Sequence, residues 1–136
     1  MTKYRLSFPY KGDTMNKDAK ILGLGGVFYK VKDPKAYLDW WRDHMGADPT
    51  DWGNFEWASD GQSRTMMSPF PADSTYLAPS TAEFMINLRV NDVASLIEKA
   101  RKGGAKIIGA VENTEYGIFG WFIDPEGIKI ELWQEV

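Results

Sequence analysis

A short pattern that is written twice limits the fold of this chain more than any other feature of its sequence. Residues 26–33 and 85–92 align at an offset of 59 positions. Alternating apolar residues followed by an aspartate are typical of a strand that leads into a helix. A duplicated unit of this kind predicts two similar modules. The aligned pairs are Val27 with Ile86, Tyr29 with Leu88, Lys30 with Arg89, Val31 with Val90, and Asp33 with Asp92.

Each copy of the strand is followed by the signals of a helix. Asp33 and Asp92 can accept hydrogen bonds from the free N–H groups of a first helical turn, and the proline after Asp33 suits the first helical position. Apolar residues then recur at helical spacing in both copies. Gly46 and the Gly103-Gly104 pair predict the two helix ends, because glycine readily adopts the left-handed backbone conformation that closes a helix.

The remaining sequence predicts short strands and turns. After the second helix we expect strands over residues 106–111, 118–123 and 128–133, and the first half predicts a similar meander over 54–58 and 64–70. The chain therefore reads as an α+β protein with two βαβββ modules.

The 136 residues are the size of one domain. We expect an N-terminal extension over 1–20 and a single domain over 21–136, with modules at about 21–75 and 84–134. The extension alternates apolar and polar residues near its start. It is therefore expected either to add an edge strand or to remain flexible.

Three segments carry a resemblance to a known family. They are GLGGVFYKVKDPKAYLDWWRDHMG, FMINLRVNDV and DPEGIKIELW. Together they resemble the vicinal oxygen chelate superfamily, which includes glyoxalase, bleomycin-resistance and extradiol dioxygenase proteins. The resemblance implies that the paired modules curve into a cupped mixed sheet whose concave side holds a small-molecule ligand. It also implies a homodimer and, if the chain is an enzyme, a lyase, isomerase or dioxygenase.

The resemblance also identifies the positions where metal-using relatives place their ligands. These positions are Gly26, Met85, Glu131 and one residue within 64–70. Glycine has no side chain to offer, a thioether is a poor ligand for hard divalent ions, and residues 64–70 hold no carboxylate or histidine. A metal centre needs about three protein ligands. We therefore expect no metal and no other cofactor, and a divalent ion held with Glu131 is the less favoured alternative.

Strand alternation selects the residues that face away from the helices. The candidate ligand-binding residues are Phe28, Lys30, Met85, Asn87, Arg89 and Trp133, and Trp57 joins them through its proximity to Glu56. Lys30 and Arg89 would favour an anionic ligand if they point inward, or would lie at the rim in water. Glu131 is the candidate catalytic residue, as a general acid or base. Its alternative is a strand carboxylate paired with Arg89 or Lys129.

Composition narrows the classes of function. The formal net charge of −3 and the dispersed basic residues argue against a nucleic-acid partner, and no run of apolar residues is long enough to cross a membrane. The absence of cysteine and of a signal-like start favours a cytoplasmic location. We expect a small-molecule binding protein without the usual catalytic metal. The alternative is a glyoxalase- or dioxygenase-like enzyme that uses Glu131 as a metal ligand or general base.

Overall fold

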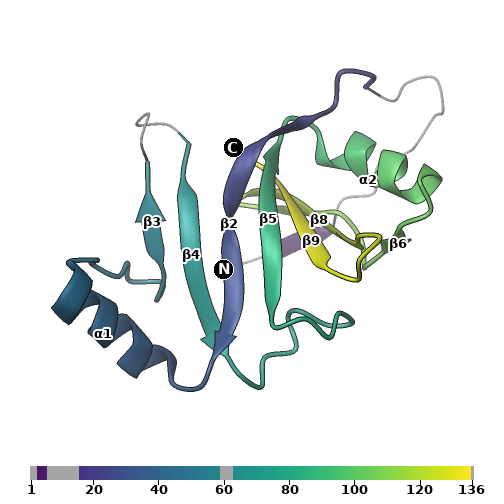
Figure 1. The fold of residues 1–136 in the computed structure, drawn as a ribbon. Helices are drawn as coiled ribbons and strands as arrows, with labels where there is room; N and C mark the ends of the chain where they lie inside the picture. Colours follow the sequence, from purple (N-terminus) through teal and green to yellow (C-terminus); the bar gives the residue numbers. More distant parts are fainter. Residues whose placement is uncertain (1–2, 6–15, 59–62, 136) are drawn as a thin grey trace.

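A computed structural model describes residues 3–5, 16–58 and 63–135, and its strands form one mixed sheet with a helix at each end (Figure 1). The order across the sheet is β1-β7-β8-β9-β5-β2-β4-β3, and β6 pairs with β8. The strands are β1 Lys3–Arg5, β2 Ile21–Val31, β3 Phe55–Trp57, β4 Thr65–Pro71, β5 Phe84–Val90, β6 Lys106–Ile107, β7 Glu112–Thr114, β8 Gly117–Ile123 and β9 Lys129–Gln134. The helices are α1 Pro34–Met45 and α2 Val93–Lys102. The predicted α+β class is confirmed.

The two modules meet through their duplicated strands. β2 and β5 pair antiparallel at the centre of the sheet, with Val27 opposite Ile86. Each of these strands then pairs in parallel with the last strand of its own module, β2 with β4 and β5 with β9. The repeat in the sequence therefore corresponds to a repeat in strand pairing, and the two halves curve as one sheet (Figure 1).

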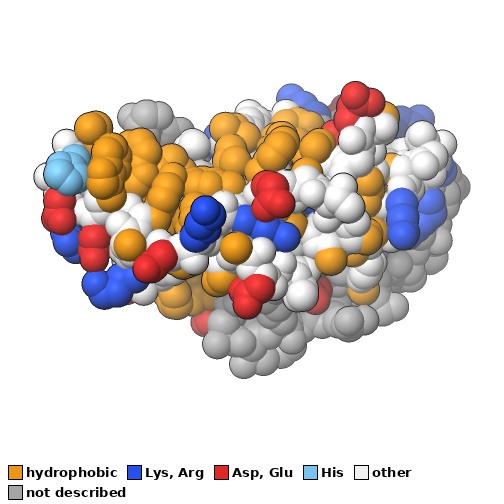
Figure 2. Space-filling model, turned by 60° about the horizontal axis from the view of Figure 1, so that its bottom comes forward, with side chains coloured by type: hydrophobic (Ala, Val, Ile, Leu, Met, Phe, Trp, Pro, Cys, Tyr) orange, Lys and Arg blue, Asp and Glu red, His pale blue; other side chains and the backbone are white. Residues whose placement is uncertain are grey.

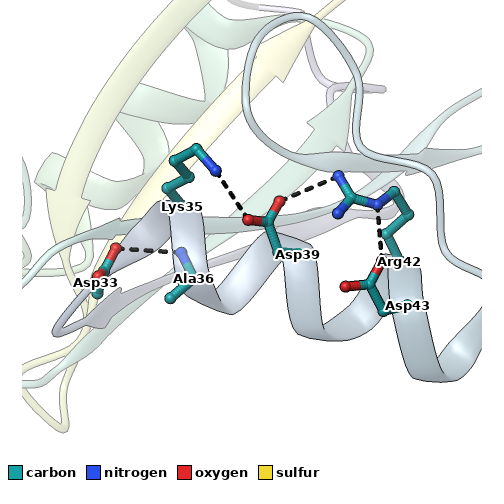
Figure 3. Close-up of polar contacts among 6 residues, drawn as sticks. All are labelled: Asp33, Lys35, Ala36, Asp39, Arg42 and Asp43. Carbon is teal, nitrogen blue, oxygen red and sulfur yellow. Dashed lines mark hydrogen bonds and ion pairs between the residues drawn. The ribbon is translucent and has the colours of Figure 1, made fainter.

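The helices begin and end where the sequence predicts. The Asp33 carboxylate accepts from the N–H of Ala36, and α1 ends at Gly46, whose φ of 67° is left-handed. The Asp92 carboxylate accepts from the N–H of Ser95 in the same way. On the outer face of α1, Figure 3 shows that Asp39 bridges a lysine and an arginine one turn away on either side. These ion pairs are exposed, so solvent screening leaves them little effect on stability.

The strands predicted over 54–58 and 64–70 correspond to β3 and β4. Between α1 and β3, residues 46–54 form a loop in which Thr50 and Gly53 make a tight turn. The N–H of Gly53 donates to the carbonyl of Thr50 at 3.0 Å, and Gly53 has a left-handed φ of 79°. This loop holds Trp52 and Asn54, which reach the concave side of the sheet.

The second module differs from the prediction in two strands. The strand expected over 106–111 is limited to β6, because Gly109 turns the chain with a φ of 70°. The next residues form β7, which the sequence analysis did not predict. β7 pairs with β8 on one side and with β1 on the other. The N-terminal extension therefore supplies an edge strand, one of the two possibilities that its alternation indicated.

The hydrophobic core lies between α2 and the sheet. Val93 and Ile97 of α2 are buried against Val90, Ile130 and Leu132, which confirms the strand faces predicted from alternation. α1 differs, because it buries no side chain completely. Its module keeps an aromatic contact between Trp41 and Phe55 and leaves several large apolar side chains exposed, including Trp40, Met45 and Trp57. Figure 2 shows hydrophobic side chains gathered around the single histidine at this end of the molecule. Neither described helix is long and apolar enough to cross a bilayer.

Candidate functional site

Glu131 is the most enclosed charged residue of the concave face, with 2% of its surface exposed. It lies on β9 directly opposite Asn87 of β5 and Trp121 of β8. Asn87 Nδ2 donates to Oε1 at 2.7 Å, and Trp121 Nε1 donates to Oε2 at 2.8 Å. The Tyr76 hydroxyl donates to the same Oε2. Both carboxylate oxygens are therefore occupied by protein donors, and we call these four residues the Glu131 cluster.

Tyr76 comes from the connection between β4 and β5 and is held from two sides. Burial and the charge of Glu131 raise the pKa of Tyr76 well above its usual value, so its phenol keeps the proton that it donates. On the other side, Lys129 Nζ donates to the Tyr76 carbonyl at 2.5 Å and lies 5.0 Å from the centre of the Tyr76 ring. Burial lowers the pKa of Lys129, while the charge of Glu131 acts in the opposite direction. The Tyr76 ring is thus fixed over the carboxylate.

A cavity of about 590 Å³ opens on the concave face, between the two modules. Rings make up much of its wall, and strands of both modules supply them. Glu131 is not part of this wall, and Tyr76, which is partly buried, is the member of the Glu131 cluster that lines it. We call this space the inter-module cavity. It is lined by Phe28, Trp52, Asn54, Glu56, Arg64, Met66, Tyr76, Glu115, Tyr116, Phe119, Trp133 and Glu135.

Parallel rings form one side of the inter-module cavity. Phe119 stacks on Trp133 with centroids 6.3 Å apart and planes 3° apart, and its other neighbour, Trp121, is tilted by 14°. Trp133 is fixed in turn by its Nε1, which donates to the carbonyl of Tyr116 at 2.9 Å. At the mouth, the ring of Trp52 meets that of Tyr116 edge-on at 5.8 Å. Such a wall suits a flat apolar ligand.

The charges around the inter-module cavity are mostly negative. Three carboxylates line it, those of Glu56, Glu115 and Glu135, with the single guanidinium of Arg64. Arg64 lies 3.7 Å from Glu56. Among residues 16–58 and 63–135, no cation lies at ion-pair distance from Glu115 or Glu135. The field at the mouth therefore favours positive rather than negative ligands.

Four of the residues predicted from the sequence meet at this place. Phe28 and Trp133 line the inter-module cavity. Asn87 is buried and holds Glu131, and Met85 lies behind them with no exposed surface, packed with Leu77 and Trp121. Strand alternation was sufficient to find these positions.

Three other predicted residues lie elsewhere. Trp57 stacks on Phe55, is 52% exposed and does not line the inter-module cavity. Its neighbour Glu56 does line it, because successive residues of a strand face opposite sides. Lys30 and Arg89 are also absent from the wall. The guanidinium of Arg89 lies against Gly23, where an added Cβ would be 2.7 Å from one of its nitrogens.

Four residues of the site were not predicted from the sequence: Tyr76, Trp52, Tyr116 and Phe119. Tyr76 lies in the connection between β4 and β5, where no periodicity marks it. Trp52 and Tyr116 lie in a loop and a turn. Only Phe119 carried a usable signal, because it alternates with Trp121 on the strand beside Glu131.

The donor set does not fit the metal centre of metal-using relatives. A side chain at Gly26 would place its Cβ 2.3 Å from the carbonyl oxygen of Met66, so this position has no room for a ligand. Met85 is enclosed by apolar groups, and both oxygens of Glu131 already accept hydrogen bonds. In β4, Ser68 is buried and bonded to Asn54. Among the described residues no three His, Cys, Asp or Glu side chains are grouped as a metal site requires.

Comparison with known proteins gives matches by family and by fold. The family model described as Glyoxalase/Bleomycin resistance protein/Dioxygenase superfamily matches residues 23–132. Comparison with curated proteins gives no match.

Solved structures at low identity share the fold. Methylmalonyl-CoA epimerase from Mycobacterium tuberculosis is 18% identical, with a TM-score of 0.59 over 93% of this chain and 96% of its own. A variant of the Streptomyces coelicolor methylmalonyl-CoA epimerase is 13% identical, with a TM-score of 0.65 over 86% and 99%. The Mn(II)-bound glyoxalase from Novosphingobium aromaticivorans is 21% identical, with a TM-score of 0.60 over 87% of this chain and 40% of its own.

Proposed function

The chain belongs to the Glyoxalase/Bleomycin resistance protein/Dioxygenase superfamily, and from this premise we propose that it is a small-molecule binding protein whose ligand occupies the inter-module cavity. One observation carries the proposal: a ring-lined cavity of about 590 Å³ lies on the concave face, over a carboxylate whose oxygens are already bonded. Ligand sites typically measure about 300–1,000 Å³, with mostly apolar walls and a few placed polar groups.

The proposal includes binding without a catalytic metal. It is supported by the lack of space at Gly26, the apolar surroundings of Met85 and the three donors around Glu131. A carboxylate that already accepts three hydrogen bonds would have to give them up to hold an ion. The donors around it would then lose this acceptor, and losing a buried hydrogen bond costs about 1–3 kcal/mol.

An enzyme remains the second candidate, and one contact favours it. Tyr76 reaches the inter-module cavity and donates to Glu131, so a proton could pass from a ligand through the phenol to the carboxylate. A general base must lie within hydrogen-bond reach of the proton that it takes, and Glu131 does not line the cavity. A metal-free lyase or isomerase reaction would therefore depend on Tyr76, and turnover would be lost in Tyr76→Phe while binding is kept.

The test of binding uses planar aromatic compounds and starts with quinoline at pH 8, where quinoline is neutral. Equilibrium dialysis measures affinity, and the thermal midpoint of each variant is compared with and without compound. Phe119→Ala removes the stacked ring and should weaken binding at least about tenfold, the factor of about 1.4 kcal/mol. Trp57→Ala is the matched control, because this ring lies outside the cavity.

Two outcomes would overturn the proposal. One is a panel of planar compounds in which none raises the thermal midpoint. The other is binding that Phe119→Ala leaves unchanged. Elemental analysis of protein purified without chelator tests the metal: a stoichiometric divalent ion that is lost in Glu131→Gln would support the enzyme instead.

The proposal also includes a homodimer and a cytoplasmic location. The dimer is supported by the asymmetry between the modules, because α2 buries three residues and α1 buries none. The large apolar side chains left exposed around α1, with Trp40 at 49% and Met45 at 58%, are the surface that a second copy would cover. Sedimentation velocity across a range of protein concentrations tests the dimer.

The proposed cytoplasmic location rests on the lack of cysteine.

A further inference from the structure

We propose that the ligand is a planar organic cation, an aromatic ring system that carries one positive charge. This inference rests on the proposed binding function and adds the chemical class of the ligand. From the sequence, an anionic ligand was one possibility, on the condition that Lys30 and Arg89 point inward. Neither of these side chains lines the inter-module cavity.

The charge around the cavity is the first argument. Of its four charged side chains, Arg64 and Glu56 lie 3.7 Å apart and offset each other. Glu115 and Glu135 remain, and among residues 16–58 and 63–135 no cation lies within ion-pair distance of either. Both carboxylates are in water as well as at the cavity, so neither pays the full desolvation penalty that burial would impose. A positive ligand at the mouth therefore meets two negative charges that no cation of residues 16–58 and 63–135 offsets.

The rings beside these carboxylates are the second argument. Glu115 precedes Tyr116 in the turn between β7 and β8, and Glu135 follows Trp133 by two residues at the end of β9. The faces of tryptophan and tyrosine rings attract cations through their electron-rich surface. Trp133 is held in a stack with Phe119, so one flat surface is already formed. A flat cation can therefore cover this wall with its ring system while its charge lies near the carboxylates.

The size of the inter-module cavity sets the third limit. A volume of about 590 Å³ accommodates a system of two or three fused rings, and a much larger ligand would extend past the Trp52 and Tyr116 rings at the mouth. The wall and the mouth of the inter-module cavity thus indicate two separate features of the ligand. The wall accounts for the planar rings, and the carboxylates account for the charge.

The experiment compares three probes of similar shape and different charge: 1-methylquinolinium, neutral quinoline and quinoline-6-carboxylate. Equilibrium dialysis at pH 8 gives the three affinities for the full chain. We expect the cation to bind at least about tenfold more tightly than the anion, a factor that two partly exposed charges supply. The cation affinity should also fall between about 0.05 M and 0.5 M salt because of screening, while quinoline binding stays constant.

Variants assign the preference to the two carboxylates. The double variant Glu115→Gln with Glu135→Gln should reduce the ratio of cation to anion affinity about tenfold and leave quinoline binding unchanged. Glu126→Gln is the matched control, because this exposed carboxylate in the turn before β9 does not line the cavity.

The outcomes separate this inference from the binding function. Quinoline that binds and loses affinity in Phe119→Ala, together with equal affinities for the cation and the anion, overturns the cation proposal alone. A cation preference that survives the double variant overturns it as well. Failure of all three probes to bind contradicts the cavity as a ligand site, and with it both proposals.

Discussion

Replacing Glu131 tests the physical account of the concave face most directly. In Glu131→Leu the side chain keeps most of its volume, but three donors lose their acceptor: Asn87 Nδ2, Trp121 Nε1 and the Tyr76 hydroxyl. A buried donor left without a partner costs about 1–3 kcal/mol. Lys129 also loses a neighbouring negative charge. Against this, the variant no longer buries a carboxylate.

The net loss follows from these opposing contributions. Breaking a buried charged network by removing one partner typically costs about 3–5 kcal/mol. We expect the unfolding free energy of Glu131→Leu to fall by that amount, a large part of the roughly 5–15 kcal/mol that holds a domain together. Glu131→Gln keeps one acceptor oxygen. That oxygen can serve either Asn87 or the pair of Tyr76 and Trp121, but not all three donors. The unfolding free energy of this variant should therefore fall by about 2 kcal/mol, since fewer hydrogen bonds to the carboxylate position are lost.

The assay is urea unfolding at pH 7, followed by tryptophan fluorescence and by far-ultraviolet circular dichroism so that two-state behaviour is checked. Glu126→Gln removes an exposed carboxylate and should stay within about 0.5 kcal/mol of the wild type. The expected order of stability is wild type, then Gln, then Leu. A Leu variant as stable as the wild type, or more stable, would refute the claim that Glu131 satisfies this cluster.

Three further predictions follow from individual residues. The pKa of Tyr76 is raised in the native state, so near pH 10 only the unfolded chain releases this proton. The unfolding free energy therefore falls as the pH rises above about 10. Tyr76→Phe should reduce this pH dependence by up to about 1.4 kcal/mol per pH unit in urea titrations from pH 9 to 11. Gly26→Ala brings a Cβ to 2.3 Å from the Met66 carbonyl and should cost about 1–3 kcal/mol in the same assay, whereas Gly103→Ala, with no atom nearer than 3.4 Å, should cost less. Trp40→Glu places a charge on the exposed face of α1 and should shift sedimentation towards the monomer, and a dimer of unchanged strength would exclude this face.

Local signals explain which parts of the fold could be predicted. The helix ends follow from Asp33, Asp92 and Gly46, which act on their own neighbours through hydrogen bonds and backbone conformation. The central strands follow from apolar alternation, which depends only on spacing. The sequence made no prediction for the loop over residues 46–54, because its turn depends on the contacts of Thr50 with Asn54 and Gly53.

The candidate site could be predicted only where strand alternation applies. Phe28 and Trp133 were found in this way, and Glu131 was recognised as inward-facing. Trp57 was assigned from proximity in sequence to Glu56, although neighbours on a strand face opposite sides. Tyr76 could not be found, because its contact with Glu131 joins residues 55 positions apart through an irregular segment.

Two glycines of β2, Gly25 and Gly26, allow close packing against β5 and β4 beside the cavity. By the offset of 59, Phe28 corresponds to Asn87, so one copy presents a ring to the cavity and the other an amide to Glu131. That amide needs space, and it has it because Gly25 carries no Cβ; an added Cβ would lie 1.8 Å from Asn87 Oδ1. Gly26 is closed by Met66 in the same way. The place where metal-using relatives hold a ligand is thus occupied here by close backbone packing of β2 against β4. Installing a ligand at Gly26 would require β4 to move away from β2, and a single substitution does not supply that movement.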